Sequence, residues 1–101
     1  MISFASDYVA GAHPTVLQRL VETNMEQLKD MFIQKGYKFF IESPTNQQFI
    51  ILENGEMERL GKEVEFCFWE KYDDNHTVVR FATSWSTTGE DMETLRTIVM
   101  A

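Results

Sequence analysis

The stretch VEFCFWEKYDDNHTVVRFATSW, from Val64 to Trp85, has the pattern of two strands joined by a tight turn. Aromatic and β-branched residues fill both arms, and the DDNH segment between them has the composition of a hairpin turn. One face of the second arm is apolar and consists of Val79, Phe81, Thr83 and Trp85. We expect this face to pack against helices, so the hairpin predicts a sheet that is covered on one side.

Arg80 lies on the opposite face of the same arm, with Val78, Ala82 and Ser84, and should therefore point away from the core. Two interpretations are open. The first is an ordinary cross-strand ion pair with a glutamate of the neighbouring arm, which offers Glu63, Glu65 and Glu70. The second is a binding site for an anion, because the planar guanidinium matches the two oxygens of a carboxylate.

Two further strands are expected upstream of this hairpin. YKFFIES (37–43) is rich in aromatic residues, and its alternation places Phe39 and Ile41 on one face. The turn residues SPTN separate it from QQFIILE (47–53), in which Phe49 and Ile51 share a face.

Helical patterns precede, separate and follow the strands. Residues 13–36 carry apolar side chains at helical spacing, which are Leu17, Leu20, Val21, Leu28, Met31 and Phe32. Gly36 is a natural stop, and the length of about 20 residues (~30 Å) suits one projecting helix or two shorter ones. Residues 54–63 predict a short helix, and residues 86–100 predict another, capped by Thr87 or Thr88.

The order of elements is therefore an extended arm over the first dozen residues, then α-β-β-α-β-β-α. This order predicts an α+β fold in which an antiparallel sheet of about four strands is packed by helices. A chain of 101 residues suits a single compact unit with one modest core.

Charge and composition exclude several classes of partner. The net charge of −7 argues against binding to nucleic acid or to an anionic membrane surface. No segment has the ~20 apolar residues that span a bilayer, and the N-terminal sequence lacks the features of a signal peptide. The single cysteine cannot form an internal disulfide, which is typical of a reducing compartment, and we expect a cytoplasmic protein.

Few other residues are candidates for chemistry. Cys67 lies between two phenylalanines, which indicates a small core or near-core residue rather than a nucleophile. His13 and His76 are far apart in sequence and have no partner at a metal-binding spacing, so we expect two surface histidines and no metal site.

Several segments together resemble one enzyme family. MISFASDYVAGAHPTVLQRLVETN resembles the N-terminus of low-specificity threonine aldolases and related β-eliminating lyases, which are pyridoxal-phosphate enzymes of the aspartate-aminotransferase type. GYKFFIESPTNQQFIILENGEMERL and FCFWEKYDDNHTVVRFATSWSTTGEDMETL resemble the C-terminal small domain of the same family. The resemblance implies two parts, an N-terminal arm and helix (1–27) and a small α+β domain (28–101), with a junction between Asn24 and Leu28.

The resemblance also implies roles for two residues. In the family, an arginine at the place of Arg80 binds the α-carboxylate of the amino-acid substrate, and a serine at the place of Ser6 helps to hold it. Ala5 stands where many relatives have arginine. The family's large domain, with its Schiff-base lysine, has no counterpart here, and none of the five lysines stands in a matching motif.

Two hypotheses about function follow. The first is a truncated threonine-aldolase-like lyase that binds no cofactor and has no catalytic residue of its own, because carbanion chemistry needs the pyridoxal ring as its electron sink. The second is a non-catalytic interaction module, since a small domain without its large partner exposes apolar surface and can self-associate. Either hypothesis is compatible with a homo-oligomer.

Overall fold

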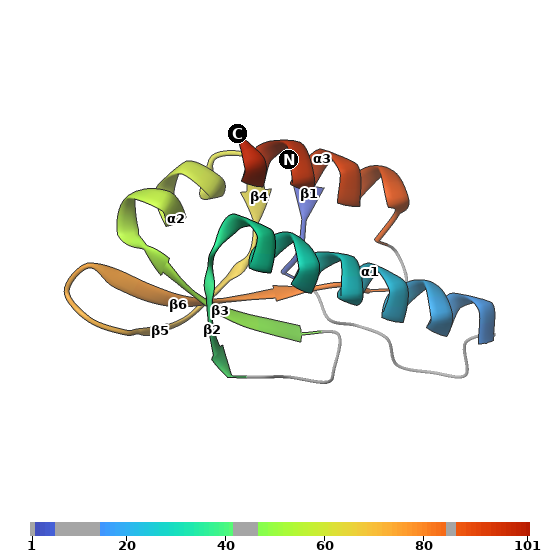
Figure 1. Ribbon diagram of the computed structural model, residues 1–101, viewed down its shortest axis with the longest axis horizontal. Coiled ribbons are helices and arrows are strands. Elements are labelled where there is room, and N and C mark those ends of the chain that lie inside the picture. Colours follow the sequence, from blue (N-terminus) through green and yellow to red (C-terminus); the bar gives the residue numbers. More distant parts are fainter. Residues whose placement is uncertain (1, 6–14, 42–46, 85–86) are drawn as a thin grey trace.

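The computed structural model describes residues 2–5, 15–41, 47–84 and 87–101. Three helices and six strands form within these ranges (Figure 1). Their order is β1 (Ile2–Ser3), α1 (Thr15–Lys35), β2 (Lys38–Ile41), β3 (Gln47–Glu53), α2 (Asn54–Gly61), β4 (Val64–Glu65), β5 (Cys67–Lys71), β6 (His76–Ala82) and α3 (Gly89–Met100). The predicted α+β fold is confirmed.

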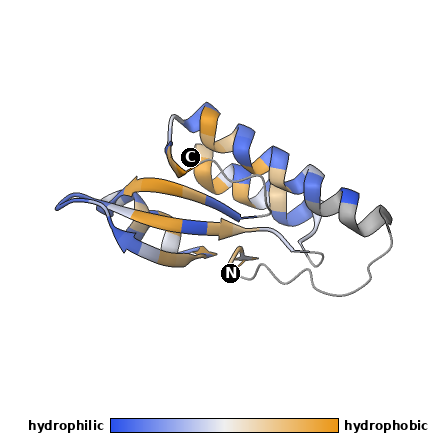
Figure 2. Cartoon of the chain, turned by 90° about the horizontal axis from the view of Figure 1, so that it is seen from below, coloured by the Kyte–Doolittle hydropathy of each residue, from blue (hydrophilic) through white to orange (hydrophobic). Residues whose placement is uncertain are grey.

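The main sheet has four antiparallel strands in the order β2-β3-β6-β5. β3 and β6 form its centre and pair over seven positions, from Gln47 opposite Ala82 to Glu53 opposite His76. β5 and β6 form the predicted hairpin, whose tip is coloured as hydrophilic in Figure 2, whereas the strands behind it are largely hydrophobic. β6 ends at Ala82, earlier than the sequence pattern suggested.

Two of the expected strands are less regular than their alternation indicated. The register of β2 shifts between Phe39 and Ile41, so Phe39 packs against the core while Ile41 is 48% exposed, and the prediction that they share a face is wrong. The expected strand from Val64 onward is interrupted at Phe66, and β5 has its own register shift between Phe68 and Glu70. Such bulges bend and twist a strand.

All three helices lie on the same side of the main sheet (Figure 1). Val79 and Phe81 of β6 are fully buried beneath them, as the alternation predicted. The rings of Phe32 on α1 and Phe81 meet edge to face with centroids 5.0 Å apart. The buried core consists of Phe4, Leu28, Met31, Phe32, Ile50, Leu52, Leu60, Val64, Val79, Phe81, Met92, Leu95 and Val99.

α1 is a single helix of 21 residues rather than two. It ends at Gly36, whose φ of 85° is a conformation that glycine adopts without the steric penalty of a side chain. Leu28, Met31 and Phe32 of this helix are fully buried, as their spacing predicted. The side chains of Leu17, Leu20 and Val21 lie outside the described part of the chain. None of the described helices is long and apolar enough to cross a membrane.

α3 begins with a capping box formed by Thr88 and Asp91. The Thr88 hydroxyl accepts from the Asp91 backbone N–H at 3.1 Å, and the Asp91 carboxylate accepts from the Thr88 N–H at 3.0 Å. From the sequence, either Thr87 or Thr88 could be the N-cap of this helix, and the structure selects Thr88. Thr87 instead bonds back to Ser84, since its hydroxyl accepts from the Ser84 N–H at 2.9 Å.

The described residues of the N-terminal arm, 2–5, pair with a strand and contribute to the core. β1 pairs in parallel with β4, and Phe4, just after β1, is fully buried in the core. The Phe4 N–H donates to the Glu65 carbonyl at 2.6 Å, and the Phe4 carbonyl accepts from the Ala82 N–H at 2.7 Å. The arm therefore lies between the start of the β4–β5 segment and the end of β6.

Candidate functional site

Arg80 lies near the end of β6 on the face opposite the helices, as predicted. In the sheet register its neighbours are Phe49 on β3 and Cys67 on β5. Its Nη2 donates to the Ala5 carbonyl at 2.9 Å and to Cys67 Sγ at 3.2 Å. The guanidinium is thus half-buried at the point where the N-terminal arm meets the sheet.

These partners differ from the glutamates that the sequence offered. Glu65 accepts a hydrogen bond from the Ser3 hydroxyl at 2.9 Å, and the backbone of Glu65 holds the arm. The partners described for Arg80 are a neutral carbonyl and a thiol. An arginine side chain at this position can attract an anion at close range.

Ser6, the second residue assigned by resemblance, lies outside the described residues. The residue before it, Ala5, is described, and its carbonyl is the acceptor for Arg80. The arm therefore reaches Arg80 one residue before Ser6. Whether Ser6 joins the same site stays a prediction.

Cys67 is the residue at this site that sequence reasoning missed. From sequence it had no cationic neighbour, but its Sγ lies 3.2 Å from Arg80 Nη2 and donates to the Ala5 carbonyl at 3.4 Å. A regular hairpin counted back from the pair Lys71–Thr77 would place Phe68 opposite Arg80. The bulge in β5 moves the pairing by one residue and brings Cys67 there instead.

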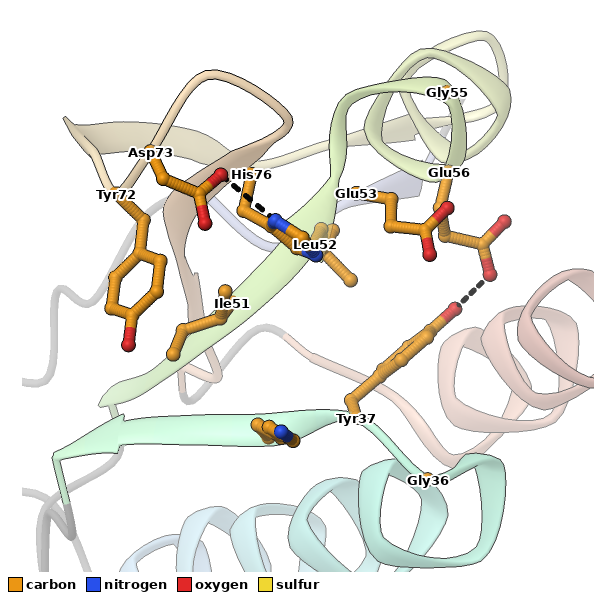
Figure 3. Close-up of a pocket in the computed structure, with 11 residues that line it drawn as sticks. Gly36, Tyr37, Ile51, Leu52, Glu53, Gly55, Glu56, Tyr72, Asp73 and His76 are labelled. Carbon is orange, nitrogen blue, oxygen red and sulfur yellow. Dashed lines mark hydrogen bonds and ion pairs between the residues drawn. The ribbon is translucent and has the colours of Figure 1, made fainter.

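A second feature is an open hollow of about 780 Å³ at the other end of the sheet, where β2 begins and β3 ends (Figure 3). Tyr37 and Glu56 form one side, and their Oη and Oε2 atoms are 2.5 Å apart. Asp73 and His76 form the other, with Oδ1 and Nδ1 2.9 Å apart. His76, expected at the surface, is thus partly exposed at the start of β6 and paired with a carboxylate, and His13 lies outside the described residues.

Glu56 is also the centre of a network that connects the helices. Arg59 binds its carboxylate through Nε at 2.5 Å and Nη2 at 3.1 Å. The same guanidinium donates to the carbonyls of Ile98 and Val99 near the end of α3, at 2.8 and 3.3 Å. Tyr37 follows the end of α1, so this network ties α1 and α3 to α2.

The network shifts the pKa values of its members. Hydrogen bonds from Arg59 lower the pKa of Glu56, because they stabilise the carboxylate. Burial, together with the hydrogen bond to Glu56, raises the pKa of Tyr37 well above its ordinary value of 10.0. At the facing wall, the hydrogen bond from His76 lowers the pKa of Asp73. Tyr37 therefore stays neutral at physiological pH, whereas both carboxyl groups stay ionised.

This hollow does not suit pyridoxal phosphate. A phosphate ester needs backbone N–H groups and cations around it. Among the described lining residues, Glu53, Glu56 and Asp73 present three carboxylates to the single lysine, Lys38. The described part of the chain also contains no group of three or more histidine, cysteine or acidic side chains placed to hold a metal ion.

Comparison with known proteins finds similarity in solved structures. No protein-family model matches the chain, and no curated protein matches its sequence. The Leishmania major threonine aldolase superposes with a TM-score of 0.79 at 24% identity, over 84% of this chain and 25% of that one. 8-Amino-7-oxononanoate synthase from Francisella tularensis superposes with a TM-score of 0.62 at 11% identity, over 83% of this chain and 26% of that one.

A third match is serine palmitoyltransferase from S. paucimobilis, in a complex that contains pyridoxal phosphate. Its TM-score is 0.65 at 11% identity, over 82% of this chain and 23% of that one. The chain thus spans about a quarter of the length of these proteins. The described chain has the α+β fold of the small domain of fold-type-I pyridoxal-phosphate enzymes, which it shares with a threonine aldolase.

Proposed function

We propose that this chain is the substrate-carboxylate-binding piece of a truncated threonine-aldolase-like lyase, and that it does not catalyse by itself. The observation that carries the proposal is the position of Arg80. It lies on the sheet face away from the helices, next to the N-terminal arm, in a fold shared with a threonine aldolase at a TM-score of 0.79. By the resemblance, Arg80 and Ser6 would contact the carboxylate.

Inactivity follows from the chemistry that cleavage of a β-hydroxy amino acid requires. The electrons of the broken carbon–carbon bond need a sink, which pyridoxal phosphate supplies when a lysine holds it. Two of the five lysines have described contacts that differ from a cofactor site. Lys71 pairs with Asp74 at 3.3 Å, and Lys35 Nζ lies 3.5 Å from the carbonyl of Ala101. We propose that no cofactor is held, and that residues 1–27 and 28–101 correspond to two parts that a large domain separates in the family.

Cofactor binding is tested with the purified chain and pyridoxal phosphate. Treatment with borohydride followed by peptide mass spectrometry reports any lysine that forms a bond to the cofactor. We expect low, scattered labelling that rises linearly with cofactor concentration. Saturable labelling of one lysine, or production of acetaldehyde from threonine faster than with free cofactor, would contradict the proposal of inactivity.

Carboxylate binding is tested by NMR titration with glycine and with its neutral amide. A single half-buried guanidinium supports weak binding, with a Kd of ~1 mM or higher. We expect shifts around Arg80 with glycine and much smaller ones with glycinamide. Arg80→Gln should remove them, whereas Arg96→Gln, which changes a partly exposed arginine on α3, should leave them intact. Equal shifts in Arg80→Gln would rule out this role for Arg80.

The second candidate is an interaction module that self-associates in the cytoplasm. It is supported by exposed apolar residues on β2 and β5, the two outer strands of the main sheet. The exposed apolar residues of these two strands, together called the edge surface below, are Phe40, Ile41, Phe68, Trp69 and the adjacent Tyr72. Phe68 is the most open of them, at 66% exposed. Exposed apolar groups of this kind favour association. Sedimentation over a dilution series tests it, and a monomer at every concentration would exclude it.

A further inference from the structure

The N-terminal arm is held as a separate strand would be held by a binding site. Its contacts come from residues 63–82, far from the arm in sequence. The Ile2 N–H points to the Glu63 carbonyl at 3.4 Å. The Phe4 backbone then bonds on both sides, to Glu65 at 2.6 Å and to Ala82 at 2.7 Å. The arm is thus bridged between two segments of the sheet through its main chain.

The side chains of the arm add specificity to this backbone pairing. Phe4 is fully buried, and its ring centroid lies 6.3 Å from that of Phe81. The Ser3 hydroxyl donates to Glu65 Oε1 at 2.9 Å. Each residue from Ile2 to Ala5 therefore has its own recognition contact, since the Ala5 carbonyl accepts from Arg80 and from Cys67.

The groove that receives the arm, called the strand seat below, has a definable ligand preference. It suits an extended peptide, because Glu65 and Ala82, on either side of Phe4, both form backbone hydrogen bonds with it. It takes an aromatic side chain into the core at the third position and a hydroxyl against Glu65 at the second. At the fourth position it takes a carbonyl within reach of the Arg80 guanidinium. The matching sequence is Ile-Ser-Phe-Ala.

We propose that the strand seat is a peptide-binding site for extended segments of this pattern, and that a second copy of this chain can fill it by exchanging arms. This inference goes beyond the proposed function, because it requires neither a substrate at Arg80 nor the edge surface. Nine residues, 6–14, separate Ala5 from the start of α1. A chain of nine residues reaches up to ~30 Å, enough to extend to a neighbouring molecule.

The arm of the same molecule competes with the arm of a neighbouring molecule for the strand seat. Because the arm belongs to the same chain as its strand seat, its effective concentration there is ~1 mM, so it stays with its own chain in dilute solution. Exchange should become populated when the protein is refolded at a concentration that approaches this value. The product is a closed dimer in which each copy supplies one strand.

The binding site is tested with full-length Phe4→Ala and a synthetic peptide of residues 1–7. The variant keeps the seat but weakens its own arm, so the peptide should raise the unfolding temperature by several degrees at saturation. A control peptide with alanine in place of phenylalanine should bind at least ~10-fold more weakly. If Phe4→Ala is unfolded alone, the same peptide should restore its circular-dichroism spectrum. No effect of the peptide in either case, or an equal effect of the control peptide, would overturn the proposal.

Arm exchange is tested by light scattering on wild-type protein refolded at high concentration. We expect a dimer fraction that an excess of the residue 1–7 peptide, present during refolding, converts to monomer. After dilution, which dissociates reversible association through the edge surface, Phe68→Ser should leave this fraction unchanged. A dimer that resists the peptide, or the absence of any dimer, would refute the exchange. Association through the edge surface would give the opposite pattern, sensitive to Phe68→Ser and insensitive to the peptide.

Discussion

Arg80 obtains its neighbours from a one-residue irregularity in the adjacent strand. The bulge between Phe68 and Glu70 places Cys67, rather than Phe68, opposite Arg80. A small thiol at that position leaves room for the Ala5 carbonyl, which accepts hydrogen bonds from both side chains. A phenylalanine ring there would offer neither a hydrogen-bond partner nor space for the arm. The local chemistry at Arg80 therefore depends on where the bulge falls.

Asn24 is a second residue whose role depends on a distant partner. It lies within α1 and is only 2% exposed, and its Nδ2 donates to the Thr87 carbonyl at 3.0 Å. We predict that Asn24→Ala lowers the free energy of unfolding by about 1–3 kcal/mol, because a buried carbonyl loses its donor. Urea denaturation measures it. Glu26→Ala on an exposed part of the same helix is the control, and an equal effect of the two variants would refute the role of Asn24.

At the scale of elements, some helix ends are fixed by neighbouring residues and others by residues far away in sequence. The start of α3 is specified locally, since Thr88 and Asp91 satisfy each other's backbone N–H groups within one turn. The end of α3 is instead satisfied by Arg59, which reaches across from α2. α1 remains one helix through the region of the inferred junction, because Leu28 and Phe32 continue its apolar face.

The capping box gives a direct prediction. Thr88→Ala removes the hydroxyl that accepts from the Asp91 N–H and should cost about 0.5–2 kcal/mol of stability. Thermal unfolding followed by circular dichroism measures the change. Thr88→Ser keeps an acceptor in the same place and should retain most of the stability. An alanine variant as stable as the serine variant would show that the cap is not needed.

The network at Glu56 predicts a pH dependence of stability. Arg59 lowers the pKa of Glu56 below its ordinary value of 4.5, so the folded state favours the carboxylate. The resulting stabilisation is present above pH 4.5 and is lost as the pH falls through the folded-state pKa. Glu56→Gln should therefore flatten the decline of stability as the pH falls below about 4.5, and should cost about 1 kcal/mol at pH 7.

Equilibrium unfolding in urea at several pH values tests this dependence. Asp73→Asn is the matched control, because Asp73 also has a lowered pKa but is paired with His76 at the surface, away from the helices. Its removal should change the stability at pH 7 less than Glu56→Gln does. If the free energy of unfolding depends on pH in the same way in Glu56→Gln and in the wild type, the network at Glu56 is not the source of this pH dependence.

At the scale of the whole molecule, the chain combines a complete core with a large exposed edge. Thirteen buried apolar residues form one cluster that includes the arm, all three helices and the central strands. The chain spans only about a quarter of the length of the structures that share its fold. A core that joins all of these elements predicts that the described chain folds as one unit.

The edge surface yields a prediction about solution behaviour. Replacing Phe68 and Trp69 together by serine should lower the weight-average mass at high concentration, because these side chains are 66% and 48% exposed. Analytical ultracentrifugation measures it. Ile33→Ser is the control, since Ile33 is 60% exposed but lies on α1, away from β5. An equal loss of association in the control would indicate nonspecific contact rather than association through the edge surface.

The sequence by itself determined the three helices and the two central strands of the main sheet. Apolar residues at helical spacing up to Gly36, alternating residues in β3 and β6, and the capping residues before α3 are signals carried within a few neighbouring residues. The face on which Arg80 lies was predictable for the same reason. So was the fold class, which follows from the order of the elements.

Only the tertiary structure decided which residues far apart in sequence contact each other. The bulge that pairs Cys67 with Arg80, the insertion of Phe4 between Glu65 and Ala82, and the contact of Asn24 with Thr87 join residues far apart in sequence. Local propensity carries no information about such contacts. They form because the packed core fixes the strands within fractions of an ångström, and a shift of one residue in register changes every partner.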